Sequence, residues 1–157
     1  MRIKKIRTMR KSIFTLVGVV MATASVMAST MTDNDRAIKY DDLPADARAF
    51  IKHHYPNEKP TYMWEDKEHS HTEYKVVMTS GVKLEFDDRG RWTEIESPNA
   101  MVPADVVPKK IADYVDKHHP ATQIVEISKE RNEWDVKLNN GTELEFNNEF
   151  HIIDVDN

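Results

Sequence analysis

Cysteine is absent from this sequence of 157 residues, and glycine occurs only four times. Without cysteine the chain can form no disulfide, has no thiol nucleophile and offers no N-terminal cysteine for a lipid anchor. So few glycines leave no glycine-rich loop for a phosphate, and the motifs of serine hydrolases and zinc peptidases are missing as well. The sequence therefore predicts a protein that is not an enzyme, needs no cofactor and is held together by its hydrophobic core.

Long hydrophobic runs are also missing, except for one stretch near the N-terminus. The basic segment MRIKKIRTMRK is followed by SIFTLVGVVMATASV. A run of about 15 residues has the length of a signal-peptide core and is short for a membrane span. We therefore predict a secretory signal peptide over residues 1–28, cleaved after Ala24 or Ala28, and then a disordered leader over residues 29–36. The protein is expected to be periplasmic or secreted, without stable membrane insertion after cleavage; an uncleaved signal anchor is the alternative.

Basic residues are scarce after the predicted signal peptide. Six of the 22 Lys and Arg residues lie before residue 12, whereas all 27 Asp and Glu residues lie after it, so the chain that remains after cleavage has a formal net charge of −11. Such an acidic surface disfavours nucleic acid and anionic membranes as partners, because both repel it. It permits a basic protein, a cationic peptide or a metal ion.

Two long segments of the sequence occur twice. LPADARAFIKHHYP aligns with VPKKIADYVDKHHP, 64 residues later, and EYKVVMTSGVKLEF aligns with EWDVKLNNGTELEF, 60 residues later. Internal similarity of this kind indicates a repeated structural unit. We therefore predict one pseudo-duplicated domain, with repeat 1 over residues 37–97 and repeat 2 over residues 98–157.

Each repeat is predicted to begin with a helix and to continue with strands. In both copies of the first segment the apolar residues follow the helical period, a proline lies near the start and a second proline stops the helix. Strands are expected at 61–64, 73–78, 82–87 and 91–96, and again at 123–127, 133–138, 142–147 and 151–156. The predicted fold is α+β, with two tandem α-β-β-β-β repeats whose helices pack on one face of an antiparallel sheet and leave the other face open.

The hairpin that is common to both repeats is predicted to have a loop of three residues. A two-residue turn would place apolar side chains opposite charged ones and mix the two faces of the hairpin. A loop at residues 79–81, and at 139–141 in repeat 2, instead pairs apolar with apolar residues, such as Val76 with Leu84. The glycine that ends each loop is expected in the left-handed region of backbone conformation.

The open face of the predicted sheet is charged and has aromatic residues nearby. Most facing charges are of opposite sign, which is ordinary surface chemistry, but Asp135 is expected opposite Glu145, a pair that a cation or a basic partner would relieve. Tyr and Trp commonly anchor protein partners. The candidate partner-binding residues are Tyr62, Trp64, Trp92, Lys75, Lys83, Glu85, Asp135, Lys137, Glu143 and Glu145.

The order of these motifs resembles a known family. The pattern LP..A..FI..H.P, then Y.V..TSG..LEFD..G.W..I, then VP..I..Y...H.P, then W.V.LNNG.ELEF is similar to the PepSY-like family of exported tandem-repeat proteins, which resemble beta-lactamase-inhibitor protein. The likeness covers about residues 37–156. It implies a helix on an antiparallel sheet in each repeat, and no known catalysis. PepSY domains are thought to bind or inhibit peptidases, and the beta-lactamase inhibitor holds an enzyme with its open sheet face, but neither activity follows from the fold alone.

One turn departs from this pattern. Phe150 occupies the position of Gly90, and Ile152 that of Trp92. Because phenylalanine disfavours a positive φ, the turn after Phe146 is expected to differ from its counterpart in repeat 1.

Three functions are compatible with these features. The first is an exported, non-enzymatic binding module that recognises a protein or peptide through the open sheet face, with inhibition of a peptidase or hydrolase as one form of that role. The second is a periplasmic metal-ion sensor or buffer that uses the acidic face with His69 and His71, although their spacing supplies no third and fourth ligand and no metal site is assigned. The third is a structural envelope protein. The remaining histidine pairs, His53-His54 and His118-His119, lie at predicted helix ends, where a cation suits the helix dipole.

Overall fold

The computed structural model describes residues 35–68 and 71–157, so the predicted signal peptide, residues 29–34 of the predicted leader and His69 lie outside the described residues. The elements are β1 (Asp35–Ala37), the 3-10 helix η2 (Tyr40–Asp42), α1 (Ala45–His54), β2 (Pro60–Glu68), β3 (His71–Met78), β4 (Lys83–Phe86), β5 (Trp92–Glu96), the 3-10 helix η3 (Ala104–Val106), α2 (Lys109–His118), β6 (Ile124–Lys129), β7 (Glu133–Leu138), β8 (Glu143–Asn147) and β9 (Ile152–Asp156). The fold class is α+β. Asp35 and Arg36, which were predicted to belong to the leader, instead belong to β1.

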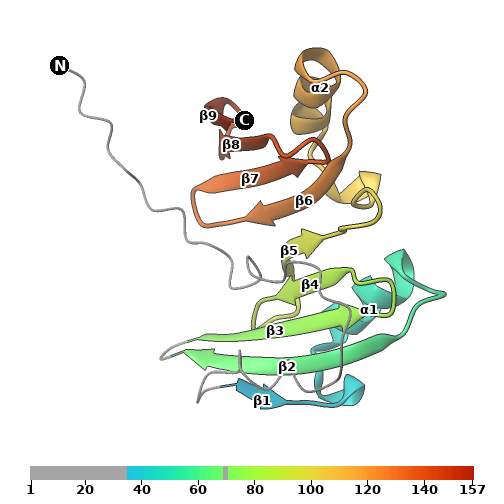
Figure 1. The fold of residues 1–157 in the computed structure, drawn as a ribbon. Coiled ribbons are helices and arrows are strands. Elements are labelled where there is room, and N and C mark those ends of the chain that lie inside the picture. The colour runs from blue at the N-terminus through green and yellow to red at the C-terminus, as the bar shows by residue number, and fades with distance from the viewer. Residues whose placement is uncertain (1–34, 69–70) are drawn as a thin grey trace. The chain divides into compact units, whose positions relative to one another are not determined.

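The described strands form one open antiparallel sheet, and their order in the sheet is their order in the chain, from β1 to β9 (Figure 1). The first half of the fold, residues 35–97, joins the second half, residues 98–157, where β5 pairs with β6. At this junction Ile95 lies opposite Ile127, and both side chains are fully buried. The apolar core therefore continues across the junction.

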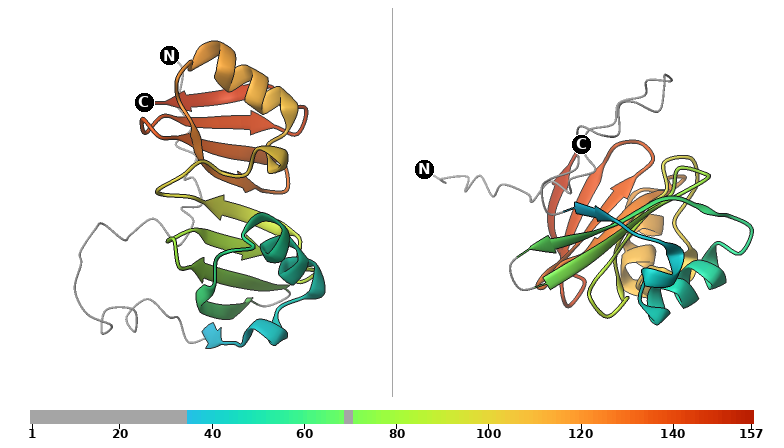
Figure 2. Two further views of the ribbon diagram at one scale, coloured as in Figure 1. Left: turned by 90° about the vertical axis from the view of Figure 1, so that its right-hand side faces the viewer. Right: turned by 90° about the horizontal axis from the view of Figure 1, so that it is seen from below.

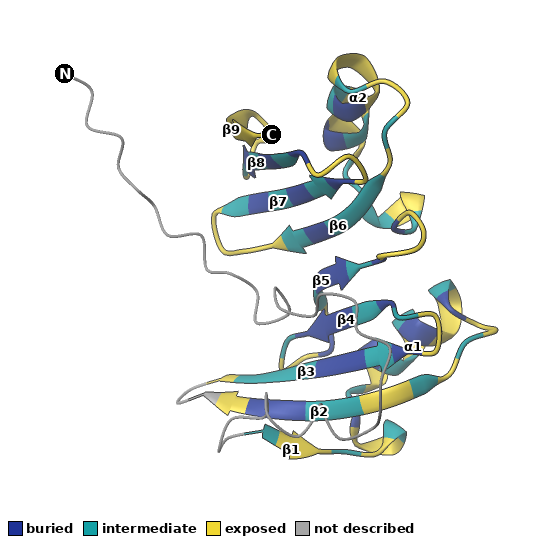
Figure 3. Cartoon of the chain, in the orientation of Figure 1, coloured by how far each residue is buried: buried dark blue, intermediate teal, exposed yellow. Residues whose placement is uncertain are grey.

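Both helices cover the same face of the sheet (Figure 2). The buried side chains of the two helices recur at the helical period predicted from the sequence; they are Ala47, Ile51, Ile111 and Val115. They pack on a row of apolar residues that runs across neighbouring strands, Val76, Leu84, Ile95, Ile127, Val136 and Leu144. Burial of each such side chain stabilises the fold by about 1.5–3 kcal/mol. Figure 3 shows this buried band, and shows β9 exposed along its length.

The two hairpin loops have the predicted geometry. Val76 pairs with Leu84 in the first half, and Val136 pairs with Leu144 in the second. Gly81 has a φ of 89° and Gly141 a φ of 92°, so both lie in the left-handed region. The three-residue loop keeps the paired apolar residues of both hairpins on the helix-covered face, and only Val77, which pairs with Lys83, lies on the other side.

The turn at Phe150 corrects one prediction. Phe150 has a φ of 65° and its amide donates to the Asn147 carbonyl, just as Gly90, with a φ of 80°, donates to the carbonyl of Asp87. The turn is therefore the same in both halves, although phenylalanine disfavours this conformation. Its cost is offset by packing, because the Phe150 ring lies 5.6 Å from the Trp134 ring.

Candidate functional site

The face of the sheet opposite the helices carries two rows of charged side chains. Direct cross-strand pairing sets both rows, because residues opposite each other point to the same side. The first row runs from Lys75 through Glu85, Glu94, Ser128, Asp135 and Glu145 to Asp154, and the second from Lys83 through Glu96, Glu126, Lys137 and Glu143 to Asp156. We call these two rows the acidic face.

The three lysines of the acidic face each lie beside a carboxylate of a neighbouring strand. Lys75 Nζ lies 3.6 Å from Glu85 Oε1, and Lys83 Nζ lies 2.9 Å from Glu96 Oε2. Lys137 Nζ lies 3.1 Å from Glu143 Oε1, so the opposite-sign pairing expected on this face is present for all three lysines. Carboxylates outnumber lysines along both rows, so the face remains strongly negative after this pairing.

Negative charge is concentrated where β5 meets β6. Glu96 lies directly opposite Glu126, and Glu94 occupies the adjacent row. Burial raises the pKa of Glu126 to about 7, and the nearby charges of Glu94 and Glu96 raise it further in the same direction. Like charges on facing residues cost free energy unless a proton or a cation relieves them.

Asp135 and Glu85, two of the predicted site residues, also have raised pKa values. Burial raises the pKa of Asp135 to about 6, with added repulsion from Glu133 and Glu130. Burial also raises the pKa of Glu85 to about 7, and Lys75 acts against this shift. The acidic face therefore holds several carboxylates whose ionised form is destabilised, which is the electrostatic property expected of a surface that receives positive charge.

Part of this face was missed from the sequence. Glu94, Glu96 and Glu126 were not among the predicted site residues, and neither were Asp154 and Asp156. The segments TEIES and IVEIS do place glutamates around a buried isoleucine, which is a strand signal. However, no local pattern in either segment predicts that the two strands pair with each other, as β5 and β6 do.

The three predicted aromatic anchors do not lie together. Tyr62 and Trp64 belong to β2, where they face Val77 and Lys75, so both are on the acidic-face side of the sheet, and 48% of the Tyr62 surface is exposed. Trp92, which we expected to point outward, lies opposite Phe86 on the helix-covered side. Its ring packs edge-on against the Trp134 ring at 6.0 Å.

A bulge explains the wrong assignment of Trp92. The register of β5 shifts so that Glu94 pairs with Glu85 but Trp92 pairs with Phe86, which leaves Thr93 as an extra residue. An extra residue reverses the alternation of side chains along a strand. Trp92 and Ile95 are therefore both on the core side, although their spacing in the sequence suggests opposite sides.

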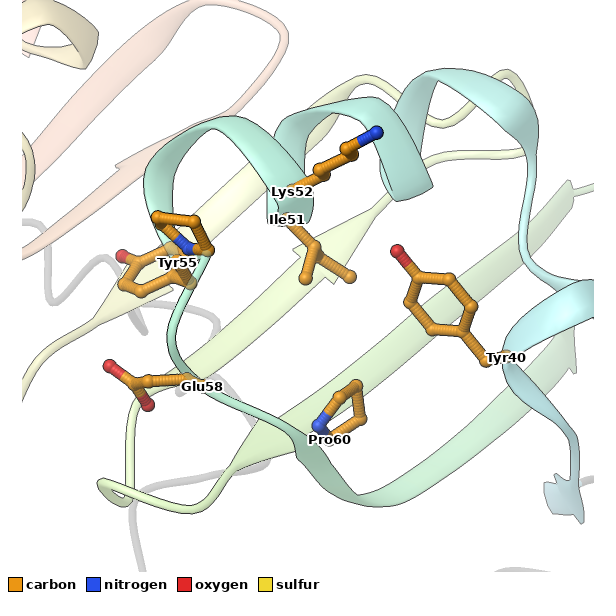
Figure 4. A pocket seen from close by; sticks show the side chains of 7 residues that line it. Tyr40, Ile51, Lys52, Tyr55, Glu58 and Pro60 are labelled. Atoms are coloured by element: carbon orange, nitrogen blue, oxygen red, sulfur yellow. The ribbon is translucent and has the colours of Figure 1, made fainter.

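A pocket of about 240 Å³ lies on the helix-covered side of the sheet, beside the end of α1 (Figure 4). Its lining residues are Tyr40, Ile51, Lys52, Tyr55, Pro56, Glu58 and Pro60. Ligand pockets usually measure about 300–1,000 Å³. This hollow is smaller, and it is separated from the acidic face by the sheet.

The raised pKa of Glu126 predicts how stability depends on pH. Its folded pKa of about 7 exceeds the ordinary value of 4.5, so the folded state binds more protons between these pH values, and stability falls as the pH rises through that window. Glu126→Gln removes this penalty. We expect the variant to be more stable than wild type by about 1–2 kcal/mol at pH 8, after allowance for solvent screening, and close to wild type at pH 4.5.

Urea denaturation at pH 4.5, 6 and 8 checks this pH dependence. Glu149→Gln is the matched control, because Glu149 is exposed in the turn between β8 and β9 and away from the β5–β6 junction. An equal gain at all three pH values, or the same gain in Glu149→Gln, would show that repulsion at the junction is not the cause.

None of the helices among residues 35–68 and 71–157 combines the length and the apolar character that crossing a membrane requires.

Comparison with solved structures gives close matches. A protein from Bacteroides vulgatus, described as a "putative periplasmic protein" of the DUF2874 family, is 37% identical, with a TM-score of 0.78, and the match covers 81% of this chain and 100% of that one. A protein from Bacteroides thetaiotaomicron, described as a "putative calcium-regulated periplasmic protein", is 34% identical, with a TM-score of 0.76 and coverage of 80% and 98%. Another protein from Bacteroides vulgatus, described as a "putative periplasmic protein of unknown function", is 28% identical, with a TM-score of 0.75 and coverage of 78% and 99%.

The chain was also compared with curated proteins and with family profiles. A search of curated proteins finds no match to this chain. The profile of a family described as "Putative beta-lactamase-inhibitor-like, PepSY-like" matches residues 72–154. These residues run from β3 to β9 and contain most of the acidic face. The resemblance seen in the sequence motifs is confirmed, and the chain belongs to the PepSY-like family of beta-lactamase-inhibitor-like proteins.

Proposed function

We propose that this protein is an exported, non-enzymatic binding module that recognises a basic protein or peptide through its acidic face. The observation that carries the proposal is the pair of charged rows on the side of the sheet opposite the helices, with raised carboxylate pKa values at Glu85, Glu126 and Asp135. A basic partner would contribute the positive charge that these carboxylates lack. Inhibition of a peptidase or hydrolase is one form of this role, in line with the inhibitor-like character of the family.

The proposal includes export by a cleaved signal peptide over residues 1–28. The basic segment and apolar run at the N-terminus support it, as do three structural neighbours described as periplasmic. Mass spectrometry of the protein purified from the cell envelope would detect cleavage after Ala24 or Ala28, and an intact N-terminus would contradict it.

The proposal also treats the two halves as tandem copies of an α-β-β-β-β unit. The helix aromatic Phe50 packs edge-on against Phe86 at 5.7 Å, and Tyr114 packs in the same way against Phe146 at 5.3 Å. The hairpin loop, the following turn and the bulge in the last strand also recur. Because each half has about 60 residues and would bury little apolar surface alone, joining the halves in one sheet increases the shared core.

Tyr62 and Trp64 are proposed to anchor the partner at one end of the face. Immobilised wild-type protein should capture a specific basic protein from envelope extract, and the double variant Tyr62→Ala with Trp64→Ala should lose it. Met101→Ala is the control, since Met101 is 54% exposed, close to the 48% of Tyr62, but lies on the connector before α2. Capture that both variants leave unchanged would exclude the aromatic anchors from the binding surface.

Binding of Ca²⁺ by the acidic face is a second candidate function. It is favoured by the facing carboxylates Glu96 and Glu126, because Ca²⁺ takes carboxylate oxygens, and by the neighbour described as calcium-regulated. Calorimetry should then show saturable Ca²⁺ binding that Glu126→Gln weakens. The absence of saturable heat at about 1 mM Ca²⁺, the weak end of extracellular sites, would exclude it.

A further inference from the structure

Three metal-ligating side chains meet at the end of α1. His53 and His54 are the last two residues of the helix, and Asp105 belongs to η3, on the connector between β5 and α2. His54 Nδ1 lies 3.5 Å from Asp105 Oδ1, and His53 Nε2 lies 3.9 Å from Asp105 Oδ2. One ligand atom from each residue lies within 4.8 Å of the other two. Among residues 35–68 and 71–157, no other group of three His, Asp or Glu side chains is placed so that it could hold a metal ion.

These separations fit a tetrahedral metal ion. Zinc bonds to nitrogen and oxygen are about 2.0–2.1 Å long, which places neighbouring ligand atoms about 3.3 Å apart. The two contacts end on different oxygens of Asp105, and the three ligand atoms lie within 4.8 Å of one another, so rotations of the exposed His53 and Asp105 side chains would bring them to this spacing. Two imidazoles and one carboxylate suit Zn²⁺ and Cu²⁺, whereas Mg²⁺ and Ca²⁺ prefer oxygen ligands alone.

The local structure holds one ligand in place. The His54 side chain is only 11% exposed and its ring lies 4.3 Å from that of Phe50. The His53 ring packs edge-on against the His54 ring, with the centroids 4.6 Å apart. A ligand fixed by packing loses less entropy when it binds a metal. His53 and Asp105 are exposed, which leaves the fourth coordination position open to water.

We propose that His53, His54 and Asp105 bind a transition-metal ion of the zinc class. The bound ion would tie the end of α1 to the connector that leads into α2, and so link the helix of the first half to the start of the second. This site lies outside the acidic face and does not depend on the function proposed for that face.

The second helix provides an internal control. A second pair of adjacent histidines lies at the end of α2, where His118 occupies the position of His54, His119 that of Tyr55, and Lys117 that of His53. Within the described residues no carboxylate completes a ligand set around His118 and His119, although the His118 ring packs on Tyr114 at 4.4 Å much as the His54 ring packs on Phe50. A site that needs Asp105 should therefore distinguish the two histidine pairs, whereas a general affinity of histidines for metal should not.

Calorimetric titration of the full chain with ZnCl₂ and with MgCl₂ tests the proposal. We expect saturable one-site binding of Zn²⁺ and none of Mg²⁺. Asp105→Asn and His53→Gln should each weaken Zn²⁺ binding at least tenfold, and both sites are exposed, so folding should be unaffected. The rise in Tm that Zn²⁺ causes in wild type should shrink in the same two variants.

Two double variants complete the test. His118→Gln with His119→Gln, and His69→Gln with His71→Gln, should both keep the wild-type affinity for Zn²⁺. The proposal would be overturned by a lack of saturable binding, by unchanged affinity in Asp105→Asn and His53→Gln, or by loss of binding in either double variant.

Discussion

Gly90→Ala is expected to destabilise the protein by about 3–5 kcal/mol, whereas Gly141→Ala should cost only about 1–2 kcal/mol. Both glycines have a positive φ, 80° and 92° respectively, so both substitutions introduce backbone strain. At Gly90 a Cβ would also lie 2.7 Å from the Ala47 nitrogen and 2.8 Å from the Pro44 Cβ, at the start of α1. At Gly141 nothing lies within 4 Å. The difference in free energy of unfolding between the two variants thus measures the cost of the clash between the new Cβ and the start of α1.

The second half shows that strain alone does not require glycine at this turn. Phe150 adopts the same conformation as Gly90, and Lys110 of α2 extends over its ring at 5.9 Å from the centroid. There the helix start leaves room for a side chain. Urea denaturation of both glycine variants, with comparison of their m-values, checks the prediction. Equal losses in Gly90→Ala and Gly141→Ala would show that the contact with α1 contributes nothing.

Reversing two charges on the acidic face is expected to weaken binding of the captured partner at least a hundredfold, or about 2.7 kcal/mol. The variant is Glu126→Lys with Asp135→Lys, which replaces two carboxylates of raised pKa near the centre of the sheet. Like charges that face each other across an interface cost several kcal/mol, because the partner's cations would then be desolvated beside ammonium groups. Surface plasmon resonance against the purified partner, at two salt concentrations, measures the loss.

The matched control reverses the same number of charges on a helix. Asp113 and Asp116 are exposed on α2, so Asp113→Lys with Asp116→Lys changes the net charge equally but leaves the acidic face intact. We expect this variant to bind within about threefold of wild type, since distant charges act mainly through screened long-range attraction. Equal weakening by both variants would mean that net charge, and no particular surface, controls binding.

The elements that could be predicted from the sequence are those fixed by local rules. The helices end at His54 and His118, two residues before the prolines that were expected to stop them. The hairpin registers followed from the requirement that apolar residues share one face, which a shift of one residue would violate. The left-handed glycines followed from the length of the loop.

The features that could not be predicted depend on contacts between distant segments. The β5–β6 pairing unites the sheet, and neither strand contains a signal for the other. The side of Trp92 depends on the bulge at Thr93, and the conformation of Phe150 on packing against Trp134. Asp105 likewise comes near His54 only after the connector has folded against α1. For this reason neither the carboxylates at the β5–β6 junction nor the cluster of His53, His54 and Asp105 could be predicted from the sequence.

The central claim is that the acidic face receives a basic partner, and chemical labelling of carboxylates tests it most directly. Carbodiimide coupling to the free chain and to its complex, read by mass spectrometry, reports which carboxylates the partner covers. We predict that Glu96, Glu126, Asp135 and Glu143 become protected in the complex, while Asp113 and Asp116 on α2 label as before. Protection of the α2 carboxylates with unchanged labelling at Glu126 and Asp135 would contradict the account.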